Sequence, residues 1–361
     1  MHVVLSGYYG FDNVGDEAIL FSIIHALRNA QPDINITVLS NNPEKTMQTY
    51  QVNSVNRRSL WAVRKVIKQS DGLISGGGSL LQDVTGPMSI PYYTGIIQLA
   101  KFYRKPVFIY AQGMGPINRK LSKWIVKVTL NKADGITVRD DNSRNLLKTI
   151  GVKSDARIAP DPVLGLDSSS FISSWLEEQK IETPIIAVSV RNWKEHRAYK
   201  ERIAKCLDRL VQNGMTVIFV PMHGIHDYEA SQDVASFMQE KSLISPHDAT
   251  IEEKISLIGA STLLIGMRLH SLIFSALRIT PFIAISYDPK IDSFAMICEQ
   301  PVIGDVTAKS WDENHLFEKV QYSIEMAEEH TLGLERRLQS YKQEAMQTAA
   351  GALQLIREKV N

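Results

Sequence analysis

The segment that decides the fold is His2–Glu17, which reads HVVLSGYYGFDNVGDE. Its start, His2–Ser6, is a short apolar run that is typical of a β-strand. A turn with three glycines follows. The turn opens a helical pattern over residues 16–30, in which apolar side chains recur every four positions. A strand, a glycine-rich turn and a helix are the opening unit of a parallel α/β sheet.

The same alternation continues along the chain. Further strands are predicted at Asn35–Leu39, Gly72–Ser75, Val107–Tyr110, Gly135–Val138, Ile185–Val190, Thr216–Val220, Leu263–Ile265 and Phe282–Ser286. Helices are predicted between them, including 199–212, 227–240, 250–259 and 271–278, and the tail 312–359 is helical and charged. The pattern weakens around 161–183, where Asp-Pro and Thr-Pro turns occur. We expect two Rossmann-like, doubly wound parallel-sheet domains that face a cleft, with C-terminal helices.

Length and composition set the limits of this interpretation. A chain of 361 residues is long enough for about two domains. We place them at residues 1–170 and 171–310, and expect 311–361 to pack back across both. A formal charge of +1 argues against a dedicated nucleic-acid binder. The two cysteines, Cys206 and Cys298, lie far apart, which excludes a disulfide scaffold and a zinc ribbon.

The N-terminal residues lack the basic start and cleavage site of a signal peptide, and no apolar run approaches ~18 residues. We therefore expect a cytoplasmic location.

Ligands of open parallel sheets bind beyond the carboxyl ends of the strands. Nearly every predicted strand is followed there by glycines or a polar group. The residues of interest in the first half are Tyr9, Asn13, Gly15, Asp16, Gly77, Gly78, Asp83 and Arg139. Those in the second half are Arg191, His223, Arg268, Leu269, His270 and Lys290.

The glycine loops point to close approach of a ligand. Gly76–Gly78 directly follow a strand, and three adjacent glycines allow backbone to come near another group, although plain loop flexibility is an alternative. The first loop lacks the G-x-G-x-x-G spacing of dinucleotide sites. Asp16 and Glu17 would repel a phosphate there. This loop is expected to face hydroxyls or the closing cleft; the alternative is a helix cap with tight-turn glycines.

Several cations are placed to bind an anion. Arg139 and Arg191 each follow a strand, and Lys290 follows a Tyr-Asp-Pro turn. For Arg139 and Arg191 an ion pair with a nearby acid, such as Asp140 or Asp141, is the competing explanation. For Lys290 it is an ordinary surface lysine.

Arg268-Leu269-His270 is the strongest indication of a functional site among these segments, because it lies between an apolar strand and an apolar helix. Strand alternation would point Arg268 and His270 to one side and Leu269 to the other. A guanidinium binds a carboxylate or phosphate with two hydrogen bonds, and an imidazole moves a proton near neutral pH. The alternative is a capping histidine beside a structural arginine.

Two weaker patterns remain open. His223-x-x-His226-Asp227 has metal-like spacing, but no third cluster supports it and Asp227 is equally a helix N-cap, so we expect no metal. Residues Arg119–Lys132 contain five basic residues, a tryptophan and no acid. This segment is either a solvated helix face or a basic amphipathic helix that docks on an anionic membrane surface.

In order, these motifs resemble the polysaccharide pyruvyl transferase family, and within it the CsaB-type bacterial cell-wall members. The matching segments are GYYGFDNVGDEAIL (7–20), LISGGGSLLQD (73–83), QGMGP (112–116), VRDDNSRNL (138–146), DPV (161–163), VSVR (188–191) and GMRLHS (266–271).

The resemblance implies a fold like that of the GT-B glycosyltransferases, with an N-terminal acceptor domain and a C-terminal donor domain. It implies transfer from phosphoenolpyruvate to β-N-acetylmannosamine of a secondary cell-wall polysaccharide. The product is a pyruvate ketal that anchors S-layer homology domains. The acceptor is expected to be lipid-linked at the inner membrane face. No cofactor and no metal are required.

On this basis we assign expected roles. Phosphoenolpyruvate would be bound by Arg139, Arg268, Leu269, His270, Lys290 and Arg191. His270 would be the general acid/base, and Asp16 or Asp83 would orient or deprotonate acceptor hydroxyls. The acceptor or cleft loops would comprise Tyr9, Asn13, Gly15, Asp16, Gly77, Gly78, Asp83 and His223. Two alternatives stay open: a GT-B glycosyltransferase that uses a nucleotide sugar, and a non-enzymatic carbohydrate-binding protein.

Overall fold

A computed structural model describes residues 1–84, 86, 88–194, 197–308 and 310–360. The chain divides into two compact units. The first comprises Met1–Leu166 together with Tyr341–Asn361, and the second comprises Asp167–Ser340. The C-terminal residues are therefore shared between the units: the long helix α14 (Ala327–Val360) begins in the second unit and ends in the first.

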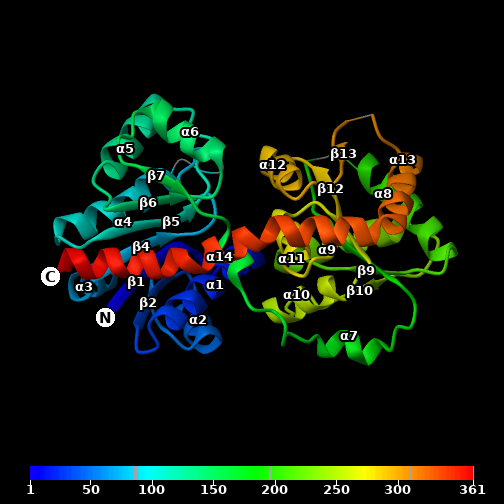
Figure 1. Cartoon of the computed structure of the whole chain (residues 1–361), viewed down its shortest axis with the longest axis horizontal. Coiled ribbons are helices and arrows are strands. Elements are labelled where there is room, and N and C mark those ends of the chain that lie inside the picture. Colours follow the sequence, from blue (N-terminus) through cyan, green and yellow to red (C-terminus); the bar gives the residue numbers. More distant parts are fainter. Residues whose placement is uncertain (85, 87, 195–196, 309, 361) are drawn as a thin grey trace. The chain divides into compact units, whose positions relative to one another are not determined.

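The first unit is built on a seven-stranded sheet with the order β3-β2-β1-β4-β5-β6-β7 (Figure 1). Its strands are β1 (His2–Tyr9), β2 (Asn35–Ser40), β3 (Asn53–Asn56), β4 (Gly72–Gly76), β5 (Val107–Gln112), β6 (Gly135–Val138) and β7 (Ala156–Ile158). Its helices, besides α14, are α1 (Val14–Ala30), α2 (Pro43–Tyr50), α3 (Leu60–Gln69), α4 (Ser89–Phe102), α5 (Lys120–Leu130), α6 (Asp141–Ile150) and the 3-10 turn η1 (Pro162–Gly165).

The second unit repeats the plan on a six-stranded sheet with the order β10-β9-β8-β11-β12-β13. Its strands are β8 (Ile185–Ser189), β9 (Thr216–Phe219), β10 (Leu243–Ile244), β11 (Leu263–Gly266), β12 (Phe282–Ser286) and β13 (Val302–Asp305). Its helices are α7 (Ser174–Gln179), α8 (Ala198–Gln212), α9 (Gly224–Phe237), α10 (Ile251–Gly259), α11 (Leu269–Leu277), α12 (Pro289–Ile297) and α13 (Glu313–Glu325).

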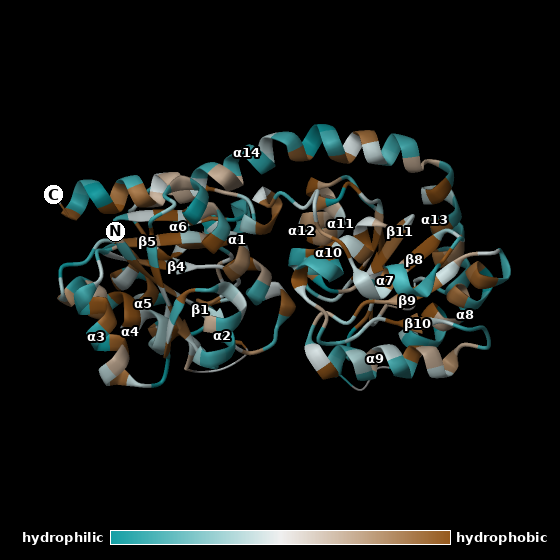
Figure 2. Ribbon diagram, turned by 90° about the horizontal axis from the view of Figure 1, so that it is seen from below, coloured by the Kyte–Doolittle hydropathy of each residue, from teal (hydrophilic) through white to brown (hydrophobic). Residues whose placement is uncertain are grey.

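All strand pairs within both described sheets are parallel. The expectation of doubly wound parallel sheets is thus confirmed. Because the strands are parallel, their carboxyl ends meet at one edge of each sheet, where the connecting loops gather. The central strands are buried on both faces, and β8, β9 and β11 are largely hydrophobic in Figure 2.

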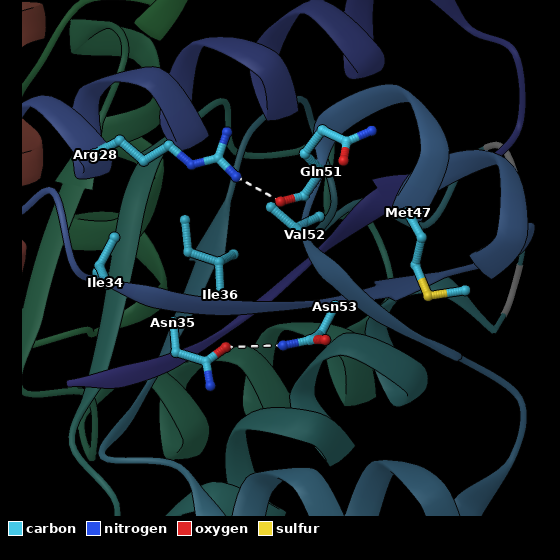
Figure 3. A pocket seen from close by; sticks show the side chains of 8 residues that line it. All are labelled: Arg28, Ile34, Asn35, Ile36, Met47, Gln51, Val52 and Asn53. Atoms are coloured by element: carbon cyan, nitrogen blue, oxygen red, sulfur yellow. Dashed lines mark hydrogen bonds between the residues drawn. The ribbon is translucent and has the colours of Figure 1, made fainter.

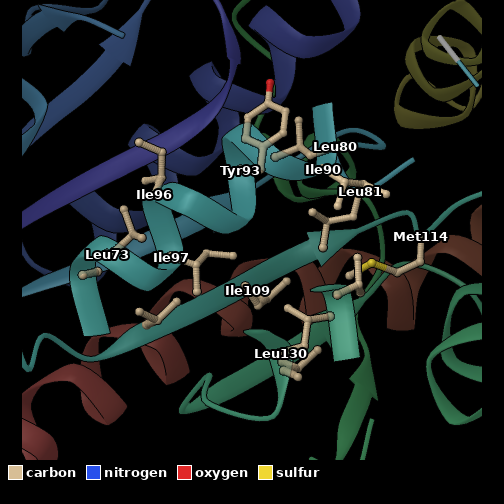
Figure 4. Close-up of a cluster of buried hydrophobic side chains, with 14 of the residues drawn as sticks. Leu73, Leu80, Leu81, Ile90, Tyr93, Ile96, Ile97, Ile109, Met114 and Leu130 are labelled. Carbon is tan, nitrogen blue, oxygen red and sulfur yellow. The ribbon is translucent and has the colours of Figure 1, made fainter. Parts of the chain in front are cut away.

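Helices α3, α4, α5 and α6 cover one face of the first sheet and bury one hydrophobic cluster against it (Figure 4). The side chains of Ile96, Ile97 and Leu130 pack there on Leu73 and Ile109 of the central strands. Helices α1 and α14 cover the opposite face. A methyl group added at Gly72 would lie 2.9 Å from Cδ1 of Ile356 on α14. The sheet is therefore closed on both sides, as its apolar strands require.

The start of α1 shows how local sequence sets a helix boundary. Asn13 is its N-cap, and its Oδ1 accepts a hydrogen bond from the backbone N–H of Gly15 at 3.2 Å. The helix therefore begins at Val14, two residues before the predicted start. Glu17 holds the preceding loop, because its Oε1 accepts from the N–H of Gly10 at 2.7 Å and its Oε2 from the hydroxyl of Tyr50 at 2.7 Å.

The triple-glycine loop after β4 is shaped by helix α1. A Cβ at Gly76 would lie 2.9 Å from Cδ1 of Ile23, one at Gly77 would lie 2.1 Å from Cγ2 of Ile19, and one at Gly78 would lie 2.5 Å from Oδ1 of Asp16. Gly77 also has φ +81°. The close approach inferred from the sequence is thus present, and the group that approaches these glycines is helix α1.

We expect Gly77→Ala to lower the free energy of unfolding by roughly 2–5 kcal/mol, since it adds both overpacking and left-handed backbone strain. Gly214→Ala is a matched control, because Gly214 has φ +82° but no atom within 4 Å of its added Cβ. Urea denaturation of both variants separates the steric contribution from the backbone contribution. Equal losses in the two variants would contradict the packing explanation.

Among the described residues, no helix is long and apolar enough to cross a membrane.

Candidate active site

Four neighbouring strands of the second sheet deliver polar groups to its carboxyl edge. Arg191 follows β8, His223 follows β9, Arg268 follows β11 and Lys290 follows β12. Strands β9, β8, β11 and β12 are consecutive in the sheet and all parallel. The sequence therefore predicted correctly that these residues gather at one edge.

Arg268 is held by a buried carboxylate. Its Nε donates to Oδ2 of Asp227 at 2.8 Å, and its Nη2 donates to Oδ1 of Asp227 at 2.5 Å. The Asp227 side chain is 1% exposed and the Arg268 side chain 16%. Oδ2 of Asp227 also accepts from the backbone N–H of Met222 at 3.3 Å. The guanidinium is thereby fixed in one orientation, and Nη1 takes no part in these contacts.

The role of Asp227 corrects the sequence interpretation. Helix α9 begins at Gly224, with His223 as the N-cap residue. Asp227 therefore lies in the first turn of the helix and is not its N-cap. Its side chain is directed to Arg268, which lies 41 positions further along the chain. Within the described residues, no group of three or more His, Cys, Asp or Glu side chains could hold a metal ion.

His223 lies beside this ion pair. Its Nδ1 is 3.5 Å from Nη2 of Arg268. Burial lowers the pKa of His223 below its ordinary value of 6.5, and the charge on Arg268 lowers it further, while Asp227 acts in the opposite direction. Arg191 contributes a further positive charge that lowers this pKa. The lowered pKa favours the neutral imidazole at neutral pH, so the positive charge at this edge comes from Arg191, Arg268 and Lys290.

The lowered pKa of His223 predicts a specific dependence on pH. The unfolded chain binds a proton as the pH falls below 6.5, whereas His223 in the folded chain does not until a lower pH. The contribution of His223 to the free energy of unfolding is therefore fully present above pH 6.5. It is lost as the pH falls through the lowered pKa of the folded state. NMR titration should give a midpoint below 6.5 for His223 and a higher midpoint in Arg268→Gln. A midpoint that Arg268→Gln leaves unchanged would contradict this electrostatic account.

His270 occupies the first turn of α11, whose N-cap residue is Arg268. Strand β11 ends at Gly266, so the expected strand alternation of Arg268, Leu269 and His270 is wrong: Leu269 and His270 are already helical. The His270 side chain is half-buried and its Nε2 is enclosed. Arg268 and His270 are therefore near each other because they are two residues apart at the start of α11, and not because they share one face of a strand.

Arg191 is flanked by aromatic rings. Its guanidinium carbon lies 4.6 Å from the ring centroid of Tyr287 and 5.3 Å from that of Trp193. The hydroxyl of Tyr199 donates to its backbone carbonyl at 2.6 Å. These contacts join the loops after β8 and β12. Stacking on a ring leaves the edge of a guanidinium available to an anion.

Lys290 lies in the first turn of α12. Its Nζ is 3.6 Å from Oδ2 of Asp288, and the lysine side chain is 37% exposed. Asp288 is the N-cap of the same helix, and its Oδ1 accepts from the backbone N–H of Lys290 at 3.0 Å. At this exposure the ion pair with Asp288 is weak.

In the first unit, Arg139 is enclosed between loops. Its side chain is 9% exposed, and its Nε lies 3.5 Å from Oδ2 of Asp140. Its Nη2 donates to Oγ of Ser79 at 3.3 Å, and a Cβ at Gly113 would lie 2.6 Å from the same nitrogen. The ion pair that the sequence offered as the alternative is therefore present, and Arg139 links the loops after β4 and β5.

The carboxylate of Asp83 is hydrogen-bonded to backbone N–H groups. It accepts from the N–H groups of Asn118 and Arg119 at 2.8 to 3.0 Å. Burial would raise the pKa of Asp83, but these hydrogen bonds outweigh it and hold the pKa below its ordinary value. Asp83 thus fixes the turn that leads into α5, which leaves little basicity for deprotonating an acceptor hydroxyl.

The remaining residues of the first loop divide into buried and accessible groups. Tyr9 is a core residue, 1% exposed, and its hydroxyl donates to the carbonyl of Gly76 at 2.7 Å. Asp16 is half-buried in the first turn of α1, where its Oδ2 accepts from Nδ2 of Asn13 at 2.6 Å. Gly15 is buried in the first turn of α1. The exposed aromatic ring at this loop is Tyr8, which stacks on Phe11 at a centroid distance of 4.0 Å.

Arg57 is a residue that the sequence interpretation missed. It follows β3, is 8% exposed, and lies 4.3 Å from the ring centroid of Tyr92 and 5.2 Å from that of Phe11. Its Nη1 donates to the carbonyl of Gly7 and its Nη2 to the hydroxyl of Tyr93. Only its place after a strand could have drawn attention to it, because its ring partners are distant in the sequence.

A pocket of about 320 Å³ lies elsewhere on the first unit (Figure 3). It is lined by Arg28, Ile36, Met47, Asn35 and Asn53, among others. Asn35 and Asn53 are the first residues of β2 and β3, so the pocket lies at the amino end of these strands. It is therefore remote from the carboxyl edge that carries the glycine loops.

Comparison with known proteins agrees with these observations. The family model of polysaccharide pyruvyl transferase matches residues 13–289. The chain belongs to the polysaccharide pyruvyl transferase family. By this membership it is a transferase of polysaccharide pyruvylation. The matched range contains Arg139, Arg191, His223, Arg268 and His270.

One curated relative and two solved structures give the context. The chain is 22% identical to the amylovoran biosynthesis protein AmsJ of Erwinia amylovora, over 80% of this chain and 84% of that protein. It is similar to Anabaena HepE in complex with UDP-glucose, with a TM-score of 0.64 and 13% identity over 99% and 98% of the two chains. It is similar to the E. coli ADP-heptose lipopolysaccharide heptosyltransferase II, with a TM-score of 0.56 and 15% identity over 91% and 100%. The GT-B-like fold expected from the sequence is confirmed.

Proposed function

We propose that this protein transfers the pyruvyl group of phosphoenolpyruvate to a β-N-acetylmannosamine residue of a secondary cell-wall polysaccharide precursor. The product would be a pyruvate ketal that anchors S-layer homology domains, as in CsaB-type members of the family. The observation that carries the donor assignment is the cluster at the carboxyl edge of the second sheet. There the fixed guanidinium of Arg268 lies beside the neutral His223, and the same edge includes Arg191 and Lys290.

The donor chemistry fits this cluster. Phosphoenolpyruvate carries a carboxylate and a phosphate on three carbons, so it needs several convergent cations. A hydrogen bond from a charged donor contributes roughly 1.5–3 kcal/mol. Arg268 is already held by Asp227, so it would bind the donor without a further loss of side-chain freedom. The assignment of Arg139 to donor binding stays a prediction from the sequence.

The reaction needs a proton transfer and two carbon–oxygen bonds. The methylene carbon of phosphoenolpyruvate gains a proton, two hydroxyls of one sugar bond to C2, and the bond between C2 and the phosphate oxygen breaks. One hydroxyl proton balances the new methyl group and the other leaves with phosphate. We assign the acid/base role to His270, whose place in the first turn of α11 brings it next to Arg268.

For the acceptor we propose the loops at the carboxyl edge of the first sheet. The Tyr8–Phe11 stack offers an apolar surface, with rings inclined by 4° and Tyr8 38% exposed. Asp16 lies in the first turn of α1, which follows this loop, and would orient a sugar hydroxyl. Sugar rings pack well on aromatic faces because their C–H groups are apolar.

The test is phosphate release from phosphoenolpyruvate, with and without a lipid-linked β-N-acetylmannosaminyl acceptor, followed by mass spectrometry. We expect acceptor-dependent release and a product heavier by pyruvate less one water. UDP-sugars serve as rival donors in parallel. A glycosylated product, or phosphate release that does not depend on the acceptor, would overturn the proposal. Ketal formation only on another sugar would overturn the acceptor assignment.

A further inference from the structure

Positive charge is concentrated in one stretch of the first unit. Residues 57–132 contain 13 Lys or Arg and only two acids, Asp71 and Asp83, although the whole chain has a formal charge of +1. Both acids are engaged by backbone: Asp71 accepts from the N–H of His2 at 2.7 Å, and Asp83 accepts from Asn118 and Arg119. Lys101 pairs with Asp134 beyond the stretch at 2.7 Å and Arg57 is buried, and most of the other basic residues are exposed, so the stretch carries a net positive charge at the surface.

The fold gathers this stretch on one side of the first sheet. Helices α3, α4 and α5 all pack on the same hydrophobic cluster, and α4 contacts both of the other two. They lie on the side of the sheet opposite the C-terminal residues of α14 (Figure 2). We call their solvent side the α3–α5 face. Its exposed residues are Leu60, Trp61, Arg64, Lys65, Lys68, Met88, Pro91, Phe102, Lys120, Leu121, Trp124 and Lys127.

The middle of the α3–α5 face is uncharged. Helix α4 and its N-cap expose Met88, Pro91, Gly95 and Phe102, which recur at helical spacing. Phe102 is 75% exposed, and a Cβ at Gly95 would meet no atom within 4 Å. The solvent side of α4 is therefore an open, apolar strip, whereas its other side is buried in the core.

The two flanking helices each combine an exposed tryptophan with lysines. Trp61 on α3 is 72% exposed, and Nζ of Lys65 lies 5.2 Å from its ring centroid. Trp124 on α5 is 60% exposed, next to the exposed Leu121. Lysines that surround an exposed indole suit an interface between water and lipid, where the ring enters the headgroup region and the ammonium groups meet phosphates.

We propose that the α3–α5 face docks on an anionic lipid surface. Its positive charge complements anionic headgroups, and its apolar strip with two tryptophans suits insertion at the acyl boundary. A nucleic acid would match the charge but not the exposed Leu60, Met88, Phe102 and Leu121, so the apolar content favours lipid. The inference does not depend on the donor or on the acceptor sugar, and it extends the basic segment noted in the sequence to three helices.

The test uses the whole chain of 361 residues and sedimentation with phosphatidylcholine vesicles, with and without phosphatidylglycerol. We expect partition into anionic vesicles at least about tenfold above that into neutral ones, since each basic residue near such a surface contributes roughly fivefold. Lys68→Glu/Lys120→Glu should lower partition by at least about tenfold on the same basis. The matched control is Lys241→Glu/Lys342→Glu, two exposed lysines outside the face, which should change partition far less.

A second readout reports insertion itself. Brominated lipids should quench the fluorescence of the wild type and much less that of Trp61→Phe/Trp124→Phe, which keeps the three other tryptophans. Ile172→Ala/Met296→Ala is the apolar control on the second unit. Circular dichroism checks that each variant folds. No preference for anionic vesicles, equal partition of the charge variant, or binding to RNA without binding to vesicles would overturn the proposal.

Discussion

Replacing Asp227 by alanine is expected to lower the free energy of unfolding by about 3–5 kcal/mol, the cost typical of removing one partner from a buried ion pair. The variant leaves the guanidinium of Arg268 without its carboxylate and the N–H of Met222 without its acceptor. It also frees Arg268 to move. A displacement of about 1 Å costs on the order of 100-fold in rate at a reacting centre, so kcat/KM for phosphoenolpyruvate should fall at least that much. Urea denaturation and steady-state kinetics measure the two effects.

Asp227→Asn separates positioning from stability. The amide keeps the size of the side chain and removes its charge, so the loss of stability should be smaller than for alanine. Because Asp227 raises the pKa of His223, the titration midpoint of His223 should fall in this variant. Reduced stability with unchanged kcat/KM would show that the Arg268–Asp227 pair is structural only. Wild-type stability of Asp227→Ala would show that the pair is not formed in solution.

The sequence predicted the central strands of both sheets but not the outer ones. The unpredicted strands are β3, β7, β10 and β13, which are the edge strands of the two sheets in the described residues. Strand β3 reads NSVN, and its residues are exposed or half-buried. An edge strand packs on few neighbours, so it lacks the apolar run by which a central strand is recognised.

The sequence was enough to predict which residues lie at the candidate site, but not which side chains they contact there. A parallel sheet sends Arg191, His223 and Arg268 to one edge, and the order of strands and helices is enough to infer that. The pairing of Arg268 with Asp227 depends on where α9 begins. The predicted start was three residues too late, so Asp227 was interpreted as an N-cap although its buried carboxylate binds Arg268. Side-chain direction around a helix changes by about 100° per residue, so small boundary errors are decisive.

Contacts between residues far apart in the chain could not be predicted from the sequence either. The glycines after β4 were correctly recognised as a site of close approach, but the approaching group is helix α1, about 60 residues earlier in the chain. Likewise Arg57 is surrounded by Phe11 from the first loop and by Tyr92 and Tyr93 from α4, two segments that are distant from it in the sequence. Such contacts follow from the packing of helices on the sheet, and no local pattern encodes them.

His270→Ala is expected to lower turnover of phosphoenolpyruvate by about 10²–10⁴-fold, the usual contribution of a general acid or base. Binding of phosphoenolpyruvate should change much less, because Arg268 and its neighbours supply the charge. In D2O the wild type should also incorporate deuterium into the methyl group of the ketal. If His270 delivers the proton to the methylene carbon, any exchange of the phosphoenolpyruvate methylene with solvent should be lost together with turnover in the variant.

His226→Ala is the matched control, since His226 is exposed and its ring centroid lies 5.5 Å from that of His223. His270→Gln keeps a polar side chain that transfers no proton near neutral pH, so it should resemble alanine. Near-normal turnover in His270→Ala, or an equal loss in His226→Ala, would show that another group moves the proton.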